Sequence, residues 1–419
     1  MNGSVIPSHP TPGTRIVPAT SAGLFAGLAR RAVFSHLRKI ERGSITVIDG
    51  GMRHAFGTPG GLVATITVHD PAFYTDMAFG GSIGAGEAYM AGFWSTDDLV
   101  ALVRIIVLNR RVLMDIEGGL AAFAQPLHWL MHALRKNTRE GSRKNIEAHY
   151  DLGNDFYSLW LDRTMTYSCN IFDRDDATLE EAATAKYDRI CRKLSLKPDD
   201  RVLEIGAGWG GFAIHAAKNY GCRVTTTTIS RQQYDWAKEL IAREGVADRV
   251  VLLFEDYREL TGKYDKLVSI EMIEAVGHHF LDTYLKVCSD RMKDESMMAL
   301  QAIIIEDQAY EAQIKSVDFI RRYIFPGGFI PSITAITRSL AKVTDLRLFH
   351  LEDLTPHYAR TLQVWRERFF ANIDAVRKLG YPEIFIRMWE YYLCYCEGAF
   401  RERYIGSAQM VLTKPDCRP

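Results

Sequence analysis

The stretch VLEIGAGWGG, residues 202–211, decides the fold. Its apolar residues run directly into glycines, and the segment FAIHAAKNY that follows has the composition of a helix. A buried strand, a tight glycine turn and a helix form the first unit of a doubly wound parallel sheet. Ligands of such sheets bind beyond the carboxyl ends of the strands. The stretch therefore predicts an α/β, Rossmann-like fold and the position of its cofactor loop.

Two kinds of cofactor compete for this loop. Gly206, Gly208 and Gly211 satisfy the G-x-G-x-x-G pattern of dinucleotide-binding proteins. That fold needs an acidic residue about twenty positions further on to hold the ribose, but the region here reads TTTTISRQQ. Trp209 also stands where the backbone would have to approach a pyrophosphate. With Glu204 ahead of the glycines, the loop favours S-adenosylmethionine, which has no pyrophosphate.

Strands continue to alternate with helices towards the C-terminus, which predicts one catalytic domain over residues 147–419. The predicted strands are residues 201–205, 223–229, 249–254, 266–270, 297–305 and 408–413. Residues 306–405, between the last two strands, contain RRYIFPGGFIPS and two helical segments rich in aromatic residues. Because this insertion follows the carboxyl end of a strand, we expect it to act as a lid over the ligand.

The N-terminal part has a different pattern, with a flexible tail expected over residues 1–20, a small α+β domain over 21–125 and a basic linker over 126–146. In the domain, short strands precede a helical run at 97–117. Residues 22–42 predict an amphipathic helix with Phe25, Leu28 and Val33 on its apolar face. Arginines 30, 31, 38 and 42 lie on the other face. This helix either docks on its own domain or lies on a membrane surface, and the domain is expected to contact lipid or a second subunit.

The amino-acid composition indicates which partners and which cellular compartment to expect. The 51 basic and 51 acidic residues balance, so no global charge favours nucleic acid. Seven cysteines without a C-x-x-C pair are typical of a reducing compartment. The first twenty residues lack the basic and apolar regions of a signal peptide, and no stretch is long and apolar enough to span a bilayer. We expect a cytoplasmic protein.

Several motifs, taken together and in order, resemble those of the cyclopropane fatty acid synthases. They are HYDLGNDFYSLWLDRTMTYSCNIF, VLEIGAGWGG, TTISRQQ, EDYREL, SIEMIEAVGH, FPGGFIPS, HYARTL and YYLCYCEGAFR, and GEAYMAGFW resembles the N-terminal domain of the long bacterial members. The resemblance covers nearly the whole chain after about residue 40. It implies a class I methyltransferase that transfers a methyl group from S-adenosylmethionine to the cis double bond of an unsaturated phospholipid acyl chain and closes a cyclopropane ring. The enzyme would work as a peripheral protein at the inner face of the membrane.

The resemblance also implies cofactor-binding residues. By similarity these are Tyr167, Ser168, Gly206, Gly208, Thr228, Gln233 and Tyr257. The cofactor loop and the strand ends add Glu204, Ala207, Ile229, Ser230 and Asp256. Asp256 closes the third predicted strand, where it is either an acceptor for the adenine amino group or a helix N-cap.

Members of this family hold a bicarbonate ion as the base, bound by a cysteine, a glutamate, a histidine and a tyrosine. Cys169, Glu274 and Tyr358 match three of these ligands. Where the family has histidine in LLHTI, this chain reads ALQAI, with Gln301 in that place. An amide donates a hydrogen bond but carries no charge. The product is therefore open between a cyclopropane and a methylene- or methyl-branched chain.

Other interpretations of the site residues remain. Glu274 is also compatible with a carboxylate in the first turn of a helix, and Tyr358 with a core residue. Cys396 matches a cysteine sometimes labelled the active residue of the family, but alkene methylation needs no covalent intermediate, so burial in the core is the alternative. Cys169 is interpreted as a neutral ligand of the base, because its neighbours include few cations to stabilise a thiolate.

A metal site, two alternative functions and the oligomeric state remain to be considered. The adjacent residues His278 and His279 are not followed by further metal-ligand spacing, so no metal site is predicted. A small-molecule N-methyltransferase would share the catalytic domain but would need neither the N-terminal domain nor the basic helix. A non-enzymatic lipid-binding protein is the remaining alternative, and a homodimer stays open.

Overall fold

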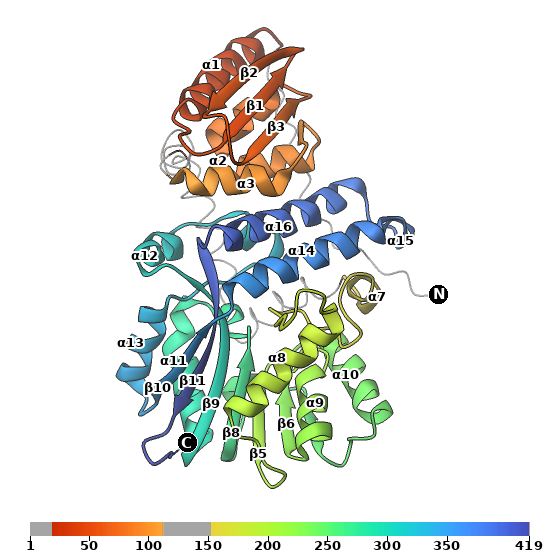
Figure 1. Ribbon diagram of the computed structural model, residues 1–419, viewed down its shortest axis with the longest axis vertical. Helices are drawn as coiled ribbons and strands as arrows, with labels where there is room; N and C mark the ends of the chain where they lie inside the picture. Colours follow the sequence, from red (N-terminus) through yellow and green to blue (C-terminus); the bar gives the residue numbers. More distant parts are fainter. Residues whose placement is uncertain (1–18, 111, 113–151, 419) are drawn as a thin grey trace.

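The computed structural model describes residues 19–110, 112 and 152–418, and Figure 1 shows its two parts. A small N-terminal domain packs on a larger unit built around a seven-stranded sheet. The helices α14 (Thr355–Ala371) and α16 (Glu383–Arg401) run between the small domain and the large sheet. The predicted linker at 126–146, most of the tail at 1–20 and the end of the helical run at 97–117 lie outside the described residues.

The N-terminal domain is a four-stranded sheet covered by helices. The strands are β1 (Ser44–Asp49), β2 (Met52–Gly57), β3 (Val63–Val68) and β4 (Trp94–Thr96), in the order β2-β1-β3-β4. The helices are α1 (Ala19–Leu37), α2 (Ala72–Met90) and α3 (Leu99–Leu108). Strand β1 pairs antiparallel with β2 and parallel with β3. Helix α2 is kinked at Gly81, whose φ of 59° and ψ of −139° are not helical.

Helix α1 is docked on its own domain. Val33, Phe34 and Leu37 are buried in the core, and the Arg30 Nε lies 2.6 Å from the Asp49 carboxylate of β1. The predicted boundaries and apolar face need two corrections. The helix ends at Leu37, not at residue 42, and Leu28 is 57% exposed. Leu28 therefore does not belong to the face that packs on the domain.

The large sheet has the strand order β10-β11-β9-β8-β5-β6-β7. Its strands are β5 (Arg201–Ile205), β6 (Arg223–Thr227), β7 (Val250–Leu253), β8 (Tyr264–Ile270), β9 (Met292–Ile305), β10 (Arg347–Asp353) and β11 (Ile405–Thr413). Neighbours from β7 to β9 run parallel, whereas β11 is antiparallel to both β9 and β10. The six predicted strands are present, with ends that differ by up to five residues. The predicted α/β, Rossmann-like sheet is confirmed.

The large unit also contains further helices. They are α7 (Asn154–Ser158), α8 (Leu179–Lys193), α9 (Gly211–Tyr220), α10 (Arg231–Arg243), α11 (Leu281–Asp290), α12 (Asp307–Lys315), α13 (Ile333–Val343) and α15 (Ile373–Lys378). Short 3-10 turns span Tyr257–Glu259, Ile273–Ala275 and His278–Phe280, and a π-helical turn spans Ile320–Ile324. The segment 306–405 is more than a lid, because β10 belongs to the sheet and α13 packs on α11.

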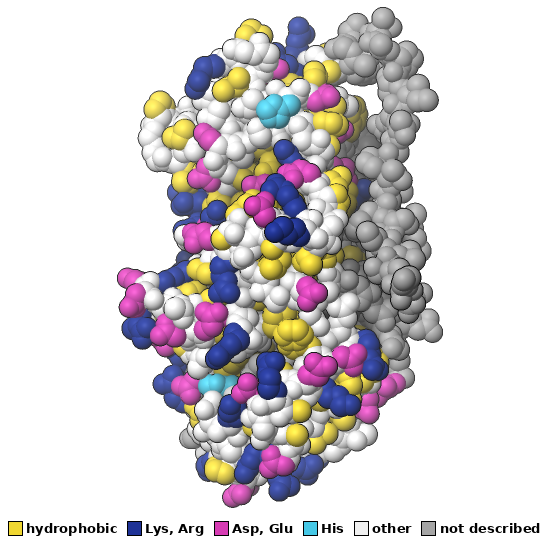
Figure 2. All heavy atoms as spheres, turned by 90° about the vertical axis from the view of Figure 1, so that its right-hand side faces the viewer, with side chains coloured by type: hydrophobic (Ala, Val, Ile, Leu, Met, Phe, Trp, Pro, Cys, Tyr) yellow, Lys and Arg dark blue, Asp and Glu magenta, His cyan; other side chains and the backbone are white. Residues whose placement is uncertain are grey.

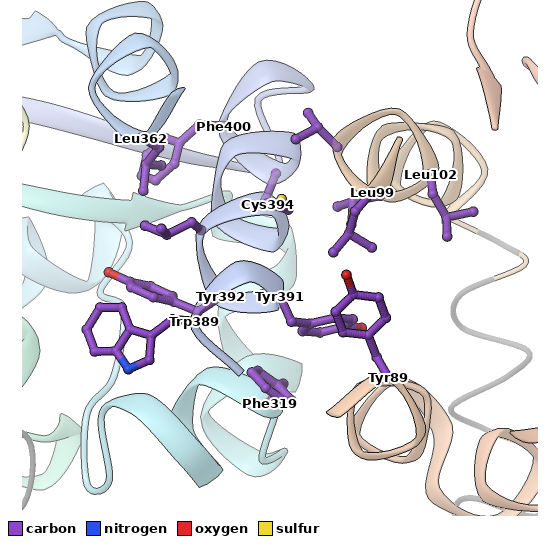
Figure 3. Close-up of a cluster of buried hydrophobic side chains, with 14 of the residues drawn as sticks. Tyr89, Leu99, Leu102, Phe319, Leu362, Trp389, Tyr391, Tyr392, Cys394 and Phe400 are labelled. Atoms are coloured by element: carbon purple, nitrogen blue, oxygen red, sulfur yellow. The ribbon is translucent and has the colours of Figure 1, made fainter. Parts of the chain in front are cut away.

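Helix α16 joins the two domains (Figure 3). Its Tyr391 faces Tyr89 of α2, with ring centroids 5.7 Å apart, while Trp389 and Tyr392 point to the other side of the helix. The domains approach closely because small residues lie at the contact: a Cβ on Gly86 would lie 2.5 Å from the ring of Phe319. The two domains are therefore packed against each other through α2, α16 and the turn that carries Phe319.

The surface shows no charge segregation on the face drawn in Figure 2, where basic and acidic side chains are intermingled. This agrees with the balanced composition of the whole chain. Among the described residues, no helix is long and apolar enough to cross a membrane.

Candidate active site

A cavity of about 930 Å³ opens at the carboxyl ends of the parallel strands. Its walls come from the loops after β5, β6, β7 and β8, from residues 303–330, and from α14 and α16. Ser82 and Arg110 of the N-terminal domain also line it. Of the predicted site residues, the following line this cavity: Tyr167, Ser168, Glu204, Gly206, Ala207, Gly208, Thr228, Ile229, Gln233, Asp256, Tyr257, Glu274, Tyr358 and Cys396.

The glycine loop has the geometry that its sequence predicts. Gly206 and Gly208 have φ values of 98° and 50°, in the left-handed region that favours glycine. A Cβ on Gly206 would also lie 3.0 Å from the Met272 side chain, and one on Gly211 would lie 2.5 Å from the Tyr187 hydroxyl. The glycines therefore keep the floor of the cavity open while allowing α9 to pack closely on its neighbours.

Polar groups at the end of β6 face the same cavity. The Thr228 hydroxyl donates to the Gln233 side-chain oxygen at 2.9 Å, which orients the amide of Gln233. Ser230 is the N-cap of α10, and its side chain accepts from the Gln233 backbone N–H. Ser230 does not line the cavity, so its part is to begin the helix that presents Gln233.

Two acidic residues flank the glycine loop. Glu204 is buried and accepts a hydrogen bond from the Thr226 hydroxyl at 2.6 Å, and burial raises its pKa to about 8. A bound cation would lower that pKa again. Asp256 caps the turn at Tyr257–Glu259 and forms an ion pair with Arg258 at 2.7 Å. The N-cap interpretation of Asp256 is therefore present in the structure, and the residue lines the cavity as well.

A carboxylate that was not among the predicted site residues lies at the centre of the site. Glu271 accepts hydrogen bonds from the Cys169 backbone N–H at 2.9 Å, from the Gln301 amide at 2.9 Å and from the Tyr358 hydroxyl at 2.7 Å. Cys169, Gln301 and Tyr358 are three of the residues expected to surround a bicarbonate ion. Their donors point at the side chain of Glu271.

Backbone strain accompanies this arrangement. Glu271 directly follows β8 and has a φ of 50°, a conformation that costs a non-glycine residue about 1–3 kcal/mol. Its N–H donates to the backbone oxygen of Gln301 at 2.8 Å, which fixes this turn against β9. Glycine would occupy the position without strain, so the carboxylate is retained at a cost in stability. Residues held in this way cluster at functional sites.

Glu274 stands beside Glu271. Its Oε1 accepts from the Ile303 N–H, whereas its buried Oε2 has no hydrogen-bond partner in the described part of the chain. Burial and the charge of Glu271 raise the pKa of Glu274 well above its usual range. Burial also raises the pKa of Glu271, but its three donors and Lys186 act in the opposite direction. Glu271 is therefore the partner that holds the negative charge, and Glu274 the one that holds a proton.

Cys169 contributes through its backbone rather than its thiol. Its side chain is fully buried and does not line the cavity, and the Sγ lies near the carbonyls of Asn170 and Leu354. Burial raises the pKa of the thiol, so it is neutral. Gln301 also lies behind the cavity wall, where its amide bridges the Cys169 carbonyl and Glu271. Both residues were expected to touch a bound anion directly; in this structure neither lines the cavity, and both donate to Glu271.

The remaining predicted residues differ in their surroundings. Tyr358 stacks on Phe400 with ring centroids 4.3 Å apart. Cys396 lines the cavity, and burial raises the pKa of its thiol, which argues against a nucleophilic role. The rings of His278 and His279 lie 3.8 Å apart, and no group of three metal-binding side chains occurs in the described ranges.

Aromatic side chains surround the apolar half of the cavity. The hydroxyl groups of Tyr167 and Tyr392 lie 2.8 Å apart, and the ring of Tyr167 packs against Phe325 and Trp365. Aromatic faces stabilise cations. The site therefore combines a glycine loop, a buried carboxylate pair and an aromatic wall, which suits a reaction that passes through positive charge in a dry pocket.

Comparison with known proteins agrees with this geometry. The family model described as mycolic acid cyclopropane synthetase matches residues 137–410. Tuberculostearic acid methyltransferase of Mycobacterium tuberculosis is 38% identical over 349 residues, which cover 80% of this chain and 79% of that protein. Cyclopropane-fatty-acyl-phospholipid synthase of Escherichia coli strain K12 is 37% identical over 358 residues, with 85% and 89% coverage.

Solved structures show the same relationship. The cyclopropane synthase from Mycobacterium tuberculosis has a TM-score of 0.61 at 31% identity, covering 65% of this chain and 98% of that one. A mycolic acid cyclopropane synthase in complex with SAH and CTAB has the same TM-score at 32% identity, again covering 65% and 98%. This chain belongs to the cyclopropane synthase family of S-adenosylmethionine-dependent methyltransferases, enzymes that act on lipid chains.

Proposed function

We propose that this enzyme methylates the cis double bond of an unsaturated phospholipid acyl chain and that Glu271 then removes a proton from the resulting cation. The observation that carries the proposal is the buried Glu271 carboxylate, held by three donors in the wall of the cavity. A carboxylate kept in a strained conformation and supplied with this many donors is organised to hold negative charge.

The cofactor half of the cavity suits S-adenosylmethionine, which supplies an electrophilic methyl group when bound. The glycine loop leaves room beside Met272. Glu204 and Asp256 offer carboxylates for cationic and hydrogen-bonding groups, and Gln233 offers an oriented amide. These residues bind and orient the cofactor, and no lysine or arginine between residues 164 and 276 lines the cavity to repel its positive charge.

An alkene is a weak nucleophile, so its methylation depends on alignment and on stabilising the cation that forms. The negative charge of Glu271 and the aromatic wall of Tyr167, Phe325 and Tyr392 provide that stabilisation. The enclosing apolar residues keep water away, because water would trap the cation as an alcohol. A phospholipid is the substrate in the name of the Escherichia coli relative, and we extend it to this chain.

Glu271 takes the place that bicarbonate has in the family. Bicarbonate would need the donors of Cys169, Gln301 and Tyr358, and in this chain all three donate to Glu271. The side chain thus supplies a carboxylate in the same set of donors. Glu274, protonated beside it, can pass a proton on because one of its oxygens has no other partner. We propose that the enzyme needs no added bicarbonate.

The product depends on where the cation stands when the proton leaves. Loss of a proton from the transferred methyl group while the cation lies on the neighbouring carbon closes a cyclopropane ring. If a hydride first shifts to that neighbouring carbon, loss of the same proton leaves an exocyclic methylene group. We propose the cyclopropane as the main product. The methylene chain is the second candidate, because Gln301 stands where the family has histidine.

One experiment tests the proposed function. The purified enzyme is incubated with S-adenosylmethionine carrying a trideuterated methyl group and with vesicles of dioleoyl phospholipid, and the released fatty acids are analysed by mass spectrometry. Both candidate products keep two deuterium atoms, and gas chromatography separates ring from methylene. Free oleic acid in place of the phospholipid tests the substrate class. A product that keeps all three deuterium atoms, or no product at all, would overturn the proposal.

A further inference from the structure

A lysine side chain is fully buried behind the cofactor half of the cavity. Lys186 lies on α8, and its Nζ donates to the Ser168 hydroxyl at 2.6 Å. Within the described residues, no carboxylate oxygen lies within 4.0 Å of this ammonium group. Burying a charge without an ion-pair partner costs several kcal/mol. A group kept at such a cost next to a binding site needs a reason.

The acids around Lys186 already have partners of their own. Asp162 accepts from the backbone N–H groups of Thr164 and Thr166, Glu204 accepts from Thr226, and Glu271 accepts from its three donors. These carboxylates, together with the Cys169 thiol, favour the charged form of Lys186 from a distance, but burial is the larger effect and lowers its pKa to about 8. The ring of Tyr187 covers one side, 4.6 Å from Nζ. At neutral pH the ammonium form is the major one.

The charged residues that line the cofactor half of the cavity are all acidic. Between residues 164 and 276 the lining includes several acids, namely Glu204, Glu255, Asp256, Glu271 and Glu274, and no lysine or arginine. S-adenosylmethionine carries a sulfonium, an ammonium and a carboxylate group. The acids suit its two cations, whereas its carboxylate has no basic residue on the surface of this half. The buried cation nearest by hydrogen bonding is Lys186, one bond behind Ser168.

Ser168 lies between Lys186 and the cavity in which the cofactor's carboxylate would bind. Its oxygen accepts from Lys186, and Ser168 is one of the residues that line the cavity. Because the oxygen is engaged by Nζ, the O–H of Ser168 remains available to donate into the cavity. Hydrogen bonds in such a chain polarise one another, so the charge of the ammonium strengthens the serine as a donor.

We propose that Ser168 and Lys186 form the subsite for the cofactor's carboxylate group, in which Ser168 donates to the carboxylate and Lys186 is the positioning residue that supplies the charge. The inference concerns cofactor binding alone and holds whichever lipid product the enzyme makes. The resemblance predicted Ser168 as a cofactor contact, and the structure adds Lys186 and the chemical group that the pair recognises.

Binding calorimetry with two ligands tests this subsite. S-adenosylmethionine and decarboxylated S-adenosylmethionine share the sulfonium and the amine and differ in the carboxylate. We expect Lys186→Met to weaken the first by about 10- to 100-fold, the range for a hydrogen bond to a charged group, and to change the second by less than about 2-fold. Ser168→Ala should act in the same way, and the double variant should add little to either single change. Lys186→Arg, which keeps the charge, should recover part of the affinity.

The matched control is Lys238→Met, at an exposed lysine on α10, which should leave both affinities unchanged. If a folded Lys186→Met protein loses affinity equally for both ligands, Lys186 has a structural role and the subsite is overturned. An unchanged affinity for both ligands would also overturn it. The pH dependence gives a second test. The affinity of the wild type for S-adenosylmethionine should fall more steeply above about pH 8, where Lys186 loses its proton, than that of Lys186→Arg, which keeps its charge so that only the ligand's own amino group titrates. Parallel pH profiles would overturn the inference.

Discussion

Replacing Glu271 by glycine separates the carboxylate from the fold that holds it. The φ of 50° at this position suits glycine, so the substitution relieves about 1 kcal/mol of strain. It also removes the charged acceptor of three hydrogen bonds, each worth about 1.5–3 kcal/mol, and with it the cost of several kcal/mol of burying that carboxylate. The variant should therefore lose no more than about 2 kcal/mol of stability, and its melting temperature should fall by only a few degrees.

The same variant should lose most of its activity. A positioned general base contributes about 10²- to 10⁴-fold to a rate, so turnover in bicarbonate-free buffer should fall by that amount. Glu271→Gly leaves the space of the lost carboxylate side chain among the donors of Cys169, Gln301 and Tyr358. Added bicarbonate should therefore restore part of the turnover in the variant and change the wild type little.

The assay measures methylated fatty acid by mass spectrometry in degassed buffer, with and without bicarbonate at constant ionic strength. Glu271→Gln is the matched control, because its amide fills the space and cannot take a proton. This control should be inactive and should not respond to bicarbonate. Wild-type turnover by Glu271→Gly in degassed buffer, or a wild-type enzyme that depends on bicarbonate, would refute the assignment of Glu271 as the base.

Three further predictions follow from the same site and from the surface. Cys169→Ser should keep turnover within about 10-fold of wild type, because the backbone N–H holds Glu271; a loss of thousands-fold in steady-state assays of the folded variant would contradict this. Glu274→Gln should lower turnover at least 100-fold and leave cofactor binding intact by calorimetry. The pKa of Glu274 is higher in the folded state than its value of about 4.3 in the unfolded chain. The folded wild-type protein is therefore stabilised by this proton at low pH and loses that stabilisation as the pH rises. The melting temperature of Glu274→Gln should exceed that of wild type increasingly from about pH 5 to 8. Replacing the exposed Arg31, Arg38 and Arg42 by glutamine should weaken binding to anionic vesicles about 100-fold at low salt, at about 1 kcal/mol per residue; the same change at Arg192, Arg243 and Arg377 is the control, and equal co-sedimentation of the two triple variants would count against the membrane surface.

The amino-acid sequence by itself determined the fold class and the cofactor loop, because both rest on local patterns. An apolar strand followed by glycines can be recognised within ten residues, and the observed φ values of Gly206 and Gly208 are those that only glycine adopts readily. The absence of a ribose-binding acid after the second strand, which excluded a dinucleotide, could also be read from a short segment. The strand β10 was not predicted, since its burial pattern is exposed almost throughout and an edge strand without apolar alternation leaves no periodic signal.

Tertiary structure alone decided which carboxylate occupies the centre of the site. Glu271 was visible as an acid directly after a predicted strand, three residues before Glu274, but sequence does not show where a side chain points. Its direction follows from the φ of 50° at the strand end. Its partners come from residues 30, 87 and 102 positions away along the chain, on β9, α14 and the loop before α8. Their meeting depends on how the sheet and helices pack, which is a property of the whole fold and not of any one segment.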